Sequence, residues 1–222
     1  MQFIYHENAG EERLNVDVRD YEHLFKVRRM GVGSRSWWRN LKDENLYEYH
    51  LLSVGKKEAL LECLEVKTLP VISLKSLHIG WCVIDPKLIE KALPMLNELG
   101  VERLSFIYAE FSQKGHKLDY ERMERILINS CQQCGRSTRM VIETFNSLVE
   151  YFKAYPKSAV LDFCETKLSE NVTLNSVVIG PEGGFSDKER KMFVDKAIFG
   201  LSCQSILRSE TAVVSVASKI LA

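Results

Sequence analysis

The sequence predicts an α/β protein in which a small N-terminal β-barrel, residues 1–70, precedes a larger parallel-sheet domain, residues 71–222. Two observations predict this fold class. The N-terminal part contains short runs of β-branched, aromatic and apolar residues between glycines and charge clusters, a pattern typical of short strands. Beyond Pro70, strand-like and helix-like segments alternate, which is typical of a parallel sheet with helical crossovers. Thr68, Leu69 and Pro70 form the expected linker, because proline ends a strand and stiffens the chain.

The N-terminal part is expected to hold five strands and one short helix. The strands are predicted over residues 2–6, 14–18, 35–40, 47–54 and 59–66, and the helix over residues 20–30. Short strands separated by turn residues indicate a small barrel or a sandwich.

In the second part, helix signals fix several boundaries. Asp85 is a predicted N-cap with Pro86 in the first turn, and Gly100 is a predicted C-cap, which sets a helix over residues 85–99 despite Pro94 inside it. The other helices are predicted over residues 120–134, 145–154, 187–199 and 210–221. Strands are predicted over residues 74–81, 103–108, 139–142, 159–163, 176–179 and 201–206.

Composition narrows the class of protein. The 222 residues are 45% hydrophobic with only 5 prolines, which suits a buried core, and 30 basic residues balance 30 acidic ones. A net charge of zero argues against indiscriminate nucleic-acid binding through a uniformly basic surface. The first ten residues lack the features of a signal peptide, and no apolar stretch reaches membrane-spanning length. Several cysteines lie in apolar segments, as reduced thiols do. We therefore expect a cytoplasmic protein with no membrane partner.

The sharpest local signal is a glycine-rich turn between a predicted strand and a predicted helix, residues 177–186. Ser186 and Glu189 have the spacing of a capping box at the helix start. Pro181 has no amide hydrogen and Glu182 would repel a polyphosphate, so the loop does not resemble a phosphate cradle. It suits S-adenosylmethionine, which has ribose hydroxyls, an adenine amine and a sulfonium cation. The alternative is a plain tight turn.

A second loop, residues 206–212, also follows a predicted strand and opens a helix, with Ser209 as the predicted N-cap. Arg208 stands directly before this helix, whose N-terminus already favours anions. Together they could stabilise negative charge that develops on a substrate. The alternative is an ordinary salt bridge between Arg208 and Glu210.

Two further patterns are open to more than one interpretation. Cys131 and Cys134 have a Cys-x-x-Cys spacing, but no second pair or histidine motif accompanies them, so we expect no metal. Arg136, beyond that helix, is expected to face RNA. A basic stretch with Trp37 and Trp38 beside it suits RNA backbone contacts and base stacking, or else the tryptophans belong to the core. Its cations are Lys26, Arg28, Arg29, Arg35 and Arg39.

These stretches together resemble the family of bacterial 16S ribosomal RNA uridine N3-methyltransferases, ribosomal small-subunit methyltransferase E. The similarity extends in the family's order along most of the chain. The matching stretches are residues 4–6, 23–30, 98–101, 133–136, 179–186 and 207–212.

The resemblance implies more than the residues alone indicate. It implies an N-terminal PUA-like, RNA-binding barrel and a catalytic domain of the SPOUT superfamily, whose C-terminal segment forms a trefoil knot. It implies S-adenosyl-L-methionine as cofactor, no metal, a homodimer, and 16S rRNA or the small ribosomal subunit as substrate in ribosome biogenesis. The implied cofactor-binding residues are Leu161, Ile179, Gly180, Glu182, Gly183, Gly184, Leu201, Ile206, Leu207, Thr211 and Ala212.

Catalytic and RNA-binding residues follow in the same way. Uridine N3 is a poor nucleophile until its proton leaves, so the enzyme has to stabilise the uridine anion and align N3 with the methyl group. Arg208 is the first candidate for this stabilisation and Arg136 the second, while Glu210 could be the base unless the proton leaves unaided. The implied RNA-binding residues are Lys26, Arg28, Arg29 and Arg136.

The chain also departs from the family pattern. Leu88, Met95, Phe111 and Gln132 stand where charged residues are usual. These positions lie outside the cofactor loops, so they bear on substrate positioning rather than on methyl-donor binding. Two alternative functions stay open: methylation of another RNA or of a ribose hydroxyl, and a non-catalytic RNA-binding ribosome assembly factor.

Overall fold

The computed structural model describes the whole chain except residues 1, 23, 26–28, 114, 116 and 170–171. The chain forms two compact units. The first contains residues 1–72 together with residues 131–139, and the second contains residues 73–130 and 140–222. Residues 131–139, expected in the second domain, thus group with the first unit. Within the described part of the chain, no helix is long and apolar enough to cross a membrane.

The first unit is built on one five-stranded sheet in the order β1-β3-β4-β5-β2. All neighbouring strands are antiparallel except β1 and β3. The predicted helix over residues 20–30 falls partly outside the described residues. The strands are β1 (Ile4–Tyr5), β2 (Arg13–Asp17), β3 (Arg35–Arg39), β4 (Asn45–Val54) and β5 (Glu58–Thr68).

Two side chains from the basic, aromatic stretch are part of this unit's interior. Trp38 is completely buried, and its ring lies edge-on to that of Tyr49 at 6.2 Å between centroids. Arg39 is also buried and donates hydrogen bonds to the carbonyl oxygens of Glu44, Asn45 and Leu69. Both residues therefore stabilise the fold, and the interpretation of Arg39 as an RNA contact was wrong.

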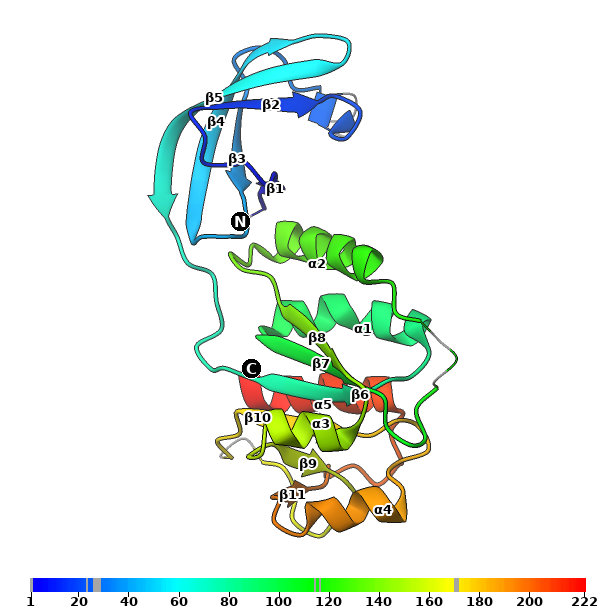
Figure 1. Ribbon diagram of the computed structural model, residues 1–222. Helices are drawn as coiled ribbons and strands as arrows, with labels where there is room; N and C mark the ends of the chain where they lie inside the picture. Colours follow the sequence, from blue (N-terminus) through cyan, green and yellow to red (C-terminus); the bar gives the residue numbers. More distant parts are fainter. Residues whose placement is uncertain (1, 23, 26–28, 114, 116, 170–171) are drawn as a thin grey trace. The chain divides into compact units, whose positions relative to one another are not determined.

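The second unit contains a six-stranded sheet in the order β11-β9-β10-β6-β7-β8, and every neighbouring pair is parallel (Figure 1). The predicted parallel α/β fold is confirmed. The strands are β6 (His78–Cys82), β7 (Arg103–Ile107), β8 (Val141–Phe145), β9 (Ala159–Leu161), β10 (Ser176–Ile179) and β11 (Ile198–Phe199). The helices are α1 (Pro86–Leu99), α2 (Tyr120–Cys134), α3 (Leu148–Ala154), α4 (Asp187–Arg190) and α5 (Ser209–Leu221).

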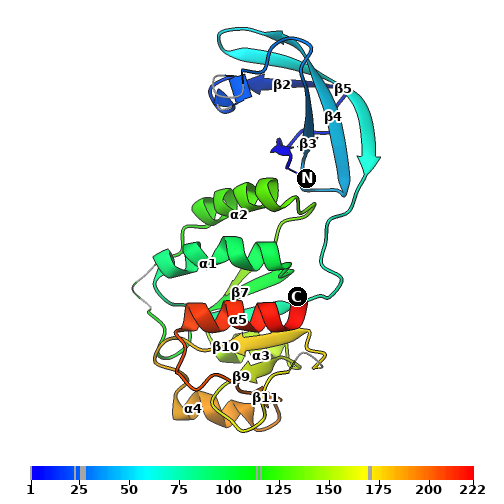
Figure 2. The same ribbon diagram turned by 180° about the vertical axis from the view of Figure 1, so that it is seen from behind.

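Helices cover both faces of this sheet, because alternate strand residues point to opposite sides. In β6, Ile79 and Trp81 pack in the cluster that includes α1 and α5, whereas Cys82 packs with the cluster that includes α3. In the second unit, α3 lies in front of the sheet in Figure 1 and α5 lies in front in the reverse view of Figure 2. Strands buried on both faces explain their nearly continuous apolar sequences.

Helix α1 has the predicted ends. The Asp85 side chain accepts from the amide of Lys87, and Gly100 has φ 98° and donates its amide to the carbonyls of Asn97 and Leu96. A positive φ of this size strains any residue with a Cβ atom, so glycine is required at the C-cap.

Two predicted elements near the C-terminus were wrong. The helix expected over residues 187–199 ends early: α4 covers Asp187–Arg190, a 3₁₀ turn covers Lys191–Phe193, and β11 follows. Ile198 and Phe199 pair with Val160 and Leu161 of β9, so the neighbouring strand overrides the helical pattern. The strand expected over residues 201–206 is a loop, and its residues 202–206 are exposed.

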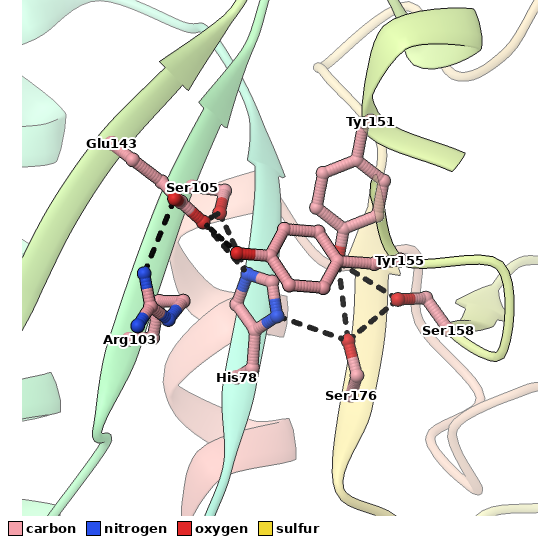
Figure 3. A network of polar contacts seen from close by, with 8 residues as sticks. All are labelled: His78, Arg103, Ser105, Glu143, Tyr151, Tyr155, Ser158 and Ser176. Atoms are coloured by element: carbon pink, nitrogen blue, oxygen red, sulfur yellow. Dashed lines mark hydrogen bonds and ion pairs between the residues drawn. The ribbon is translucent and has the colours of Figure 1, made fainter. Parts of the chain in front are cut away.

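At the amino ends of the parallel strands, eight polar side chains form a connected network (Figure 3). Ser105 donates to Glu143 at 2.6 Å and also contacts His78 Nε2 at 2.6 Å, and Tyr155 donates to Glu143 at 2.7 Å. Arg103 pairs with the other Glu143 oxygen at 3.2 Å. On the far side of His78, hydrogen bonds join Ser176, Ser158 and Tyr151. Strands β6, β7, β8 and β10 are thereby linked through side chains as well as through the sheet.

Burial lowers the pKa of His78 to about 4, with Glu143 opposing that shift. Burial would raise the pKa of Glu143, but hydrogen bonds from Ser105 and Tyr155 and the charge of Arg103 lower it overall. His78 is therefore neutral, and Glu143 ionised, when the protein is folded at neutral pH.

We predict that His78→Gln weakens the acid sensitivity of folding. Between pH 6.5 and about 4 the unfolded chain protonates His78 and the folded chain does not, so the free energy of unfolding falls as pH falls through this window. The depressed pKa of Glu143 acts in the same direction at lower pH. The free energy of unfolding, measured with urea across this pH range, should fall by up to roughly 3 kcal/mol less in the variant than in the wild type. Parallel pH profiles would contradict this assignment.

Candidate active site

A cavity of about 960 Å³ lies at the carboxyl ends of β9 and β10 in the second unit. Three segments line it: residues 161–163 with 167, residues 179–185 with 190, and residues 200–201, 203–209 and 212. This position is where ligands bind in open parallel sheets. Its volume is in the range of small-molecule sites.

The glycine-rich loop contributes residues 179–185 to the cavity wall, and three of these residues are glycines. The amide of Gly184 donates to the carbonyl of Pro181 at 2.9 Å, which closes a turn, and Gly184 has φ 70°. A Cβ atom at Gly180 would lie 3.1 Å from the ring of Phe185. Glycine at these two positions lets the backbone make a turn too tight for larger residues, and leaves peptide groups available to a ligand.

The helix after the loop begins with the predicted capping box. The Ser186 hydroxyl accepts from the amide of Glu189 at 3.3 Å, and Glu189 accepts from the amide of Ser186 at 2.9 Å. The second oxygen of the buried Glu189 carboxylate accepts from the amide of Glu110 at 2.8 Å. The loop after β7 is thereby fixed to the start of α4.

Ser209 has a different role from the one predicted. It is the first residue of α5 rather than its N-cap, which is Arg208. Its hydroxyl donates to the carbonyl of Gly180 at 2.7 Å and accepts from Trp81 Nε1 at 2.8 Å. These bonds to distant segments occupy the hydroxyl, so it does not cap its own helix. They hold the start of α5 against the glycine-rich loop.

Asp162 and Arg190 form an ion pair on the cavity wall that the sequence analysis missed. Arg190 Nε also donates to the carbonyl of Phe185 at 3.2 Å, so its guanidinium joins the end of β9 to the glycine-rich loop. The position of Asp162 directly after a buried strand, at the sheet edge where ligands bind, was the available signal.

The structure brings together nearly all the residues expected to bind the cofactor. Leu161, Ile179, Gly180 and Leu201 line the cavity, and so do the other expected residues apart from Thr211, which is exposed on α5. The others are Glu182, Gly183, Gly184, Ile206, Leu207 and Ala212.

The expected catalytic residues differ in position. Arg208 lines the cavity with a side chain that is 76% exposed, and its Nη1 lies 4.0 Å from Glu210 Oε1. An exposed pair at this distance contributes little to stability, so the guanidinium is available to a substrate. Glu210 does not line the cavity, but its Oε2 is buried and accepts no hydrogen bond from any described residue.

The expected RNA-binding residues lie in the first unit. Lys26 and Arg28 are outside the described residues, and Arg29 is exposed with φ 52°. Arg136 is buried rather than exposed to a substrate. Its expected catalytic and RNA-binding roles therefore stay predictions. Among the residues that the structure describes, no three histidine, cysteine or acidic side chains gather as metal ligands.

Comparison with known proteins identifies the family. Residues 72–221 match the model of the RNA methyltransferase domain. Ribosomal RNA small subunit methyltransferase E of Helicobacter pylori strain J99 is 45% identical over 98% of both chains. The chain belongs to this family. The resemblance found in the sequence is confirmed, and the protein is an RNA methyltransferase.

More distant relatives agree with this assignment. Ribosomal RNA small subunit methyltransferase E of Aquifex aeolicus is 33% identical over 61% of this chain and 63% of its own. The crystal structure of the Neisseria gonorrhoeae enzyme of that name, bound to S-adenosyl methionine, has a TM-score of 0.79. It is 18% identical and covers 98% of this chain and 96% of its own, so the two share a fold.

We predict that Ser209→Ala destabilises the second unit. The substitution leaves the buried Trp81 N–H and the Gly180 carbonyl without their partner, at a cost of about 1–3 kcal/mol for each unsatisfied group. Ser215→Ala is the matched control, because among the described residues the Ser215 hydroxyl bonds only to the carbonyl of Thr211 in the same helix. Urea unfolding should show a clear loss for Ser209→Ala and almost none for Ser215→Ala. Equal losses would contradict the bridging role.

Proposed function

We propose that this chain transfers the methyl group of S-adenosylmethionine to N3 of a uridine in the 16S rRNA of the small ribosomal subunit. One observation carries the proposal: the three segments expected to bind the cofactor meet around a single cavity, with Arg208 at its wall. Membership of the ribosomal RNA small subunit methyltransferase E family gives the substrate class.

The residues of the cavity fit this cofactor. Leu161, Ile179, Leu201 and Leu207 give apolar walls for an adenine ring, and the glycine-rich loop gives peptide groups for its amine and for the ribose. Glu182 adds a carboxylate, which favours a cation and disfavours a polyphosphate. When bound, S-adenosylmethionine supplies an electrophilic methyl group on a positively charged sulfur.

The chain's own residues prepare the uridine. Loss of the N3 proton spreads negative charge onto the two flanking carbonyl oxygens, and the exposed guanidinium of Arg208 is placed to stabilise it. Glu210 is the proposed proton acceptor through Oε1, the oxygen that lies 4.0 Å from Arg208 Nη1, unless the proton leaves unaided; its Oε2 is buried. The roles expected for Arg136 rest on the resemblance alone.

The finer features of the fold and assembly belong to the same proposal. We propose that the second unit has the trefoil knot of the SPOUT superfamily and that the first is a PUA-like barrel that binds rRNA through Lys26, Arg28 and Arg29. The support for the knot is that the segment between β11 and α5 lines the same cavity as the loops after β9 and β10, as the resemblance implies for the knotted cofactor site. We propose that the enzyme acts as a cytoplasmic homodimer during ribosome biogenesis. An experimental structure of the dimer, traced through residues 160–222, tests these features together.

The methyl-donor site is tested first by calorimetric titration with S-adenosylmethionine. We expect micromolar binding, about −8 kcal/mol. Gly183→Val should weaken cofactor binding by about tenfold or more. Even a Cβ atom at position 183 would lie only 3.3 Å from Phe111 Cβ, so the larger valine side chain would displace the loop. Gly31→Val is the matched control, since a Cβ atom at Gly31 meets nothing within 4 Å.

Each outcome separates the candidate functions. Cofactor binding together with a primer-extension stop on methylated 16S rRNA supports base methylation at a pairing position. Methyl transfer without a stop supports the alternative of a ribose hydroxyl. A folded wild-type protein that binds no cofactor would overturn the proposal in favour of a non-catalytic RNA-binding assembly factor.

We predict that Arg208→Ala preserves cofactor affinity and loses turnover. An exposed side chain with one weak contact is not needed to shape the cavity, so the Kd for S-adenosylmethionine should stay within about twofold of the wild type. Loss of one group that stabilises a developing anion should lower kcat by about a hundredfold to a thousandfold. Calorimetry and single-turnover methylation measure the two effects separately. If affinity and turnover fell together, Arg208 would be a cofactor ligand instead.

A further inference from the structure

The loop after β7 presents an aromatic side chain beside the cavity. Phe111 is 51% exposed, although most large apolar side chains of the second unit are buried. Its Cβ lies 3.3 Å, and its ring carbons 3.7 Å, from where a Cβ atom of Gly183 would stand. Gly183 lines the cavity and Phe111 does not, so the Phe111 ring lies outside the loop that encloses the cavity.

Hydrogen bonds fix the loop on both sides of this ring. The amide of Ala109 donates to the Ser112 hydroxyl at 3.0 Å, and the amide of Ser112 donates to the Ala109 carbonyl at 3.2 Å. The Ser112 hydroxyl also reaches the carbonyl of Ile107 at 3.3 Å. Phe111 is thus held in a closed turn at the carboxyl end of β7.

The residue before Phe111 is attached to the glycine-rich loop itself. The amide of Glu110 donates to Glu189 at 2.8 Å, and the hydroxyl of Ser186 donates to the Glu110 carboxylate at 2.6 Å. The position of the ring is therefore set by the segment that shapes the cavity. A rigid, half-exposed ring costs little conformational entropy when another flat group packs on it, which favours a role in recognition.

Phe111 differs from the other exposed apolar side chains at this edge. Phe163 and Ile206 are more exposed still, at 77% and 81%, but both line the cavity and so face its ligand. Phe111 is exposed and does not line the cavity, so its ring is available to a group other than the ligand of the cavity.

We propose that Phe111 is a stacking residue for the RNA substrate, with its ring against a nucleobase of the segment that is methylated. This inference rests on the proposed function, since RNA is the occupant that brings a nucleobase to this edge. Stacking of one base on an aromatic side chain changes affinity by about tenfold to a hundredfold, and it tolerates any base because each has a flat face.

The test compares Phe111→Ala, Phe111→Leu and Phe111→Trp with the wild type as full-length protein. The KM for 16S rRNA and the Kd of the protein–RNA complex should rise about tenfold to a hundredfold in the alanine and leucine variants. The tryptophan variant should retain wild-type values, because it keeps a flat ring. The kcat, the Kd for S-adenosylmethionine and the sedimentation coefficient should change little in all three.

Two further variants locate the effect. Val194→Ala removes an apolar side chain that is more exposed than Phe111, at 82%, and that does not line the cavity, so it should leave RNA affinity unchanged. Phe163→Ala should weaken S-adenosylmethionine binding, because Phe163 lines the cavity.

Three results would overturn the stacking role: wild-type RNA affinity in Phe111→Ala, full rescue by leucine, or a changed oligomeric state, which would assign the ring to a partner subunit. Because RNA affinity is measured directly, a wild-type protein that binds RNA without methylating it would contradict the proposed function and leave this comparison intact.

Discussion

The hydroxyl of Ser209 joins three segments that are far apart in the sequence. It bonds to the carbonyl of Gly180 in the glycine-rich loop and to the indole of Trp81 at the end of β6, while its own backbone starts α5. Both loops line the cavity, and Ser209 fixes the start of α5 to the glycine-rich loop; Arg208, the residue before Ser209, lies at the cavity wall.

The two ends of the parallel strands differ in the groups that they present: bonded polar side chains at the amino ends, and a glycine-rich cavity at the carboxyl ends. At the amino edge, the side chains of His78, Glu143 and their neighbours form hydrogen bonds with one another that link the strands (Figure 3). At the carboxyl edge, glycines form part of the cavity wall; of the side chains that hold the loops, Arg190 lines the cavity and Glu189 does not. Rigidity at one edge and available backbone at the other give the ligand a preorganised site without filling it with protein side chains.

Local signals predicted what depends on local interactions. The N-cap at Asp85, the C-cap at Gly100 and the capping box of Ser186 and Glu189 each arise from neighbouring residues, and each was correctly placed. Pairing between distant segments was not predictable in the same way. Ile198 is in β11 because β9 lies beside it, and its own neighbours favour a helix.

The candidate site shows the same division. The glycine-rich loop and Arg208 could be predicted from residue type and position, because few structural roles require such residues directly before a helix. The Asp162–Arg190 ion pair and the bond from Glu110 to Glu189 join segments that meet only after folding. The place of Asp162 after a buried strand was a signal for that residue, but no spacing in the sequence marks either pairing. Arg136 shows the reverse case: its motif suggested an arginine that faces RNA, and the structure shows the residue buried.

The balance of 30 basic and 30 acidic residues restricts how an RNA substrate can be held. A protein without net charge gains little from long-range attraction, and attraction between exposed charges weakens further at physiological ionic strength. Specific affinity therefore has to come from local contacts that salt screens weakly. An exposed guanidinium such as Arg208 is most effective where substrate binding excludes water around it, and a nucleobase packed on an aromatic ring such as Phe111 would help to exclude that water. Phe111 lies against Gly183, and Ser209, next to Arg208, is hydrogen-bonded to Gly180, so the loop that shapes the methyl-donor cavity also sets the positions of both contacts.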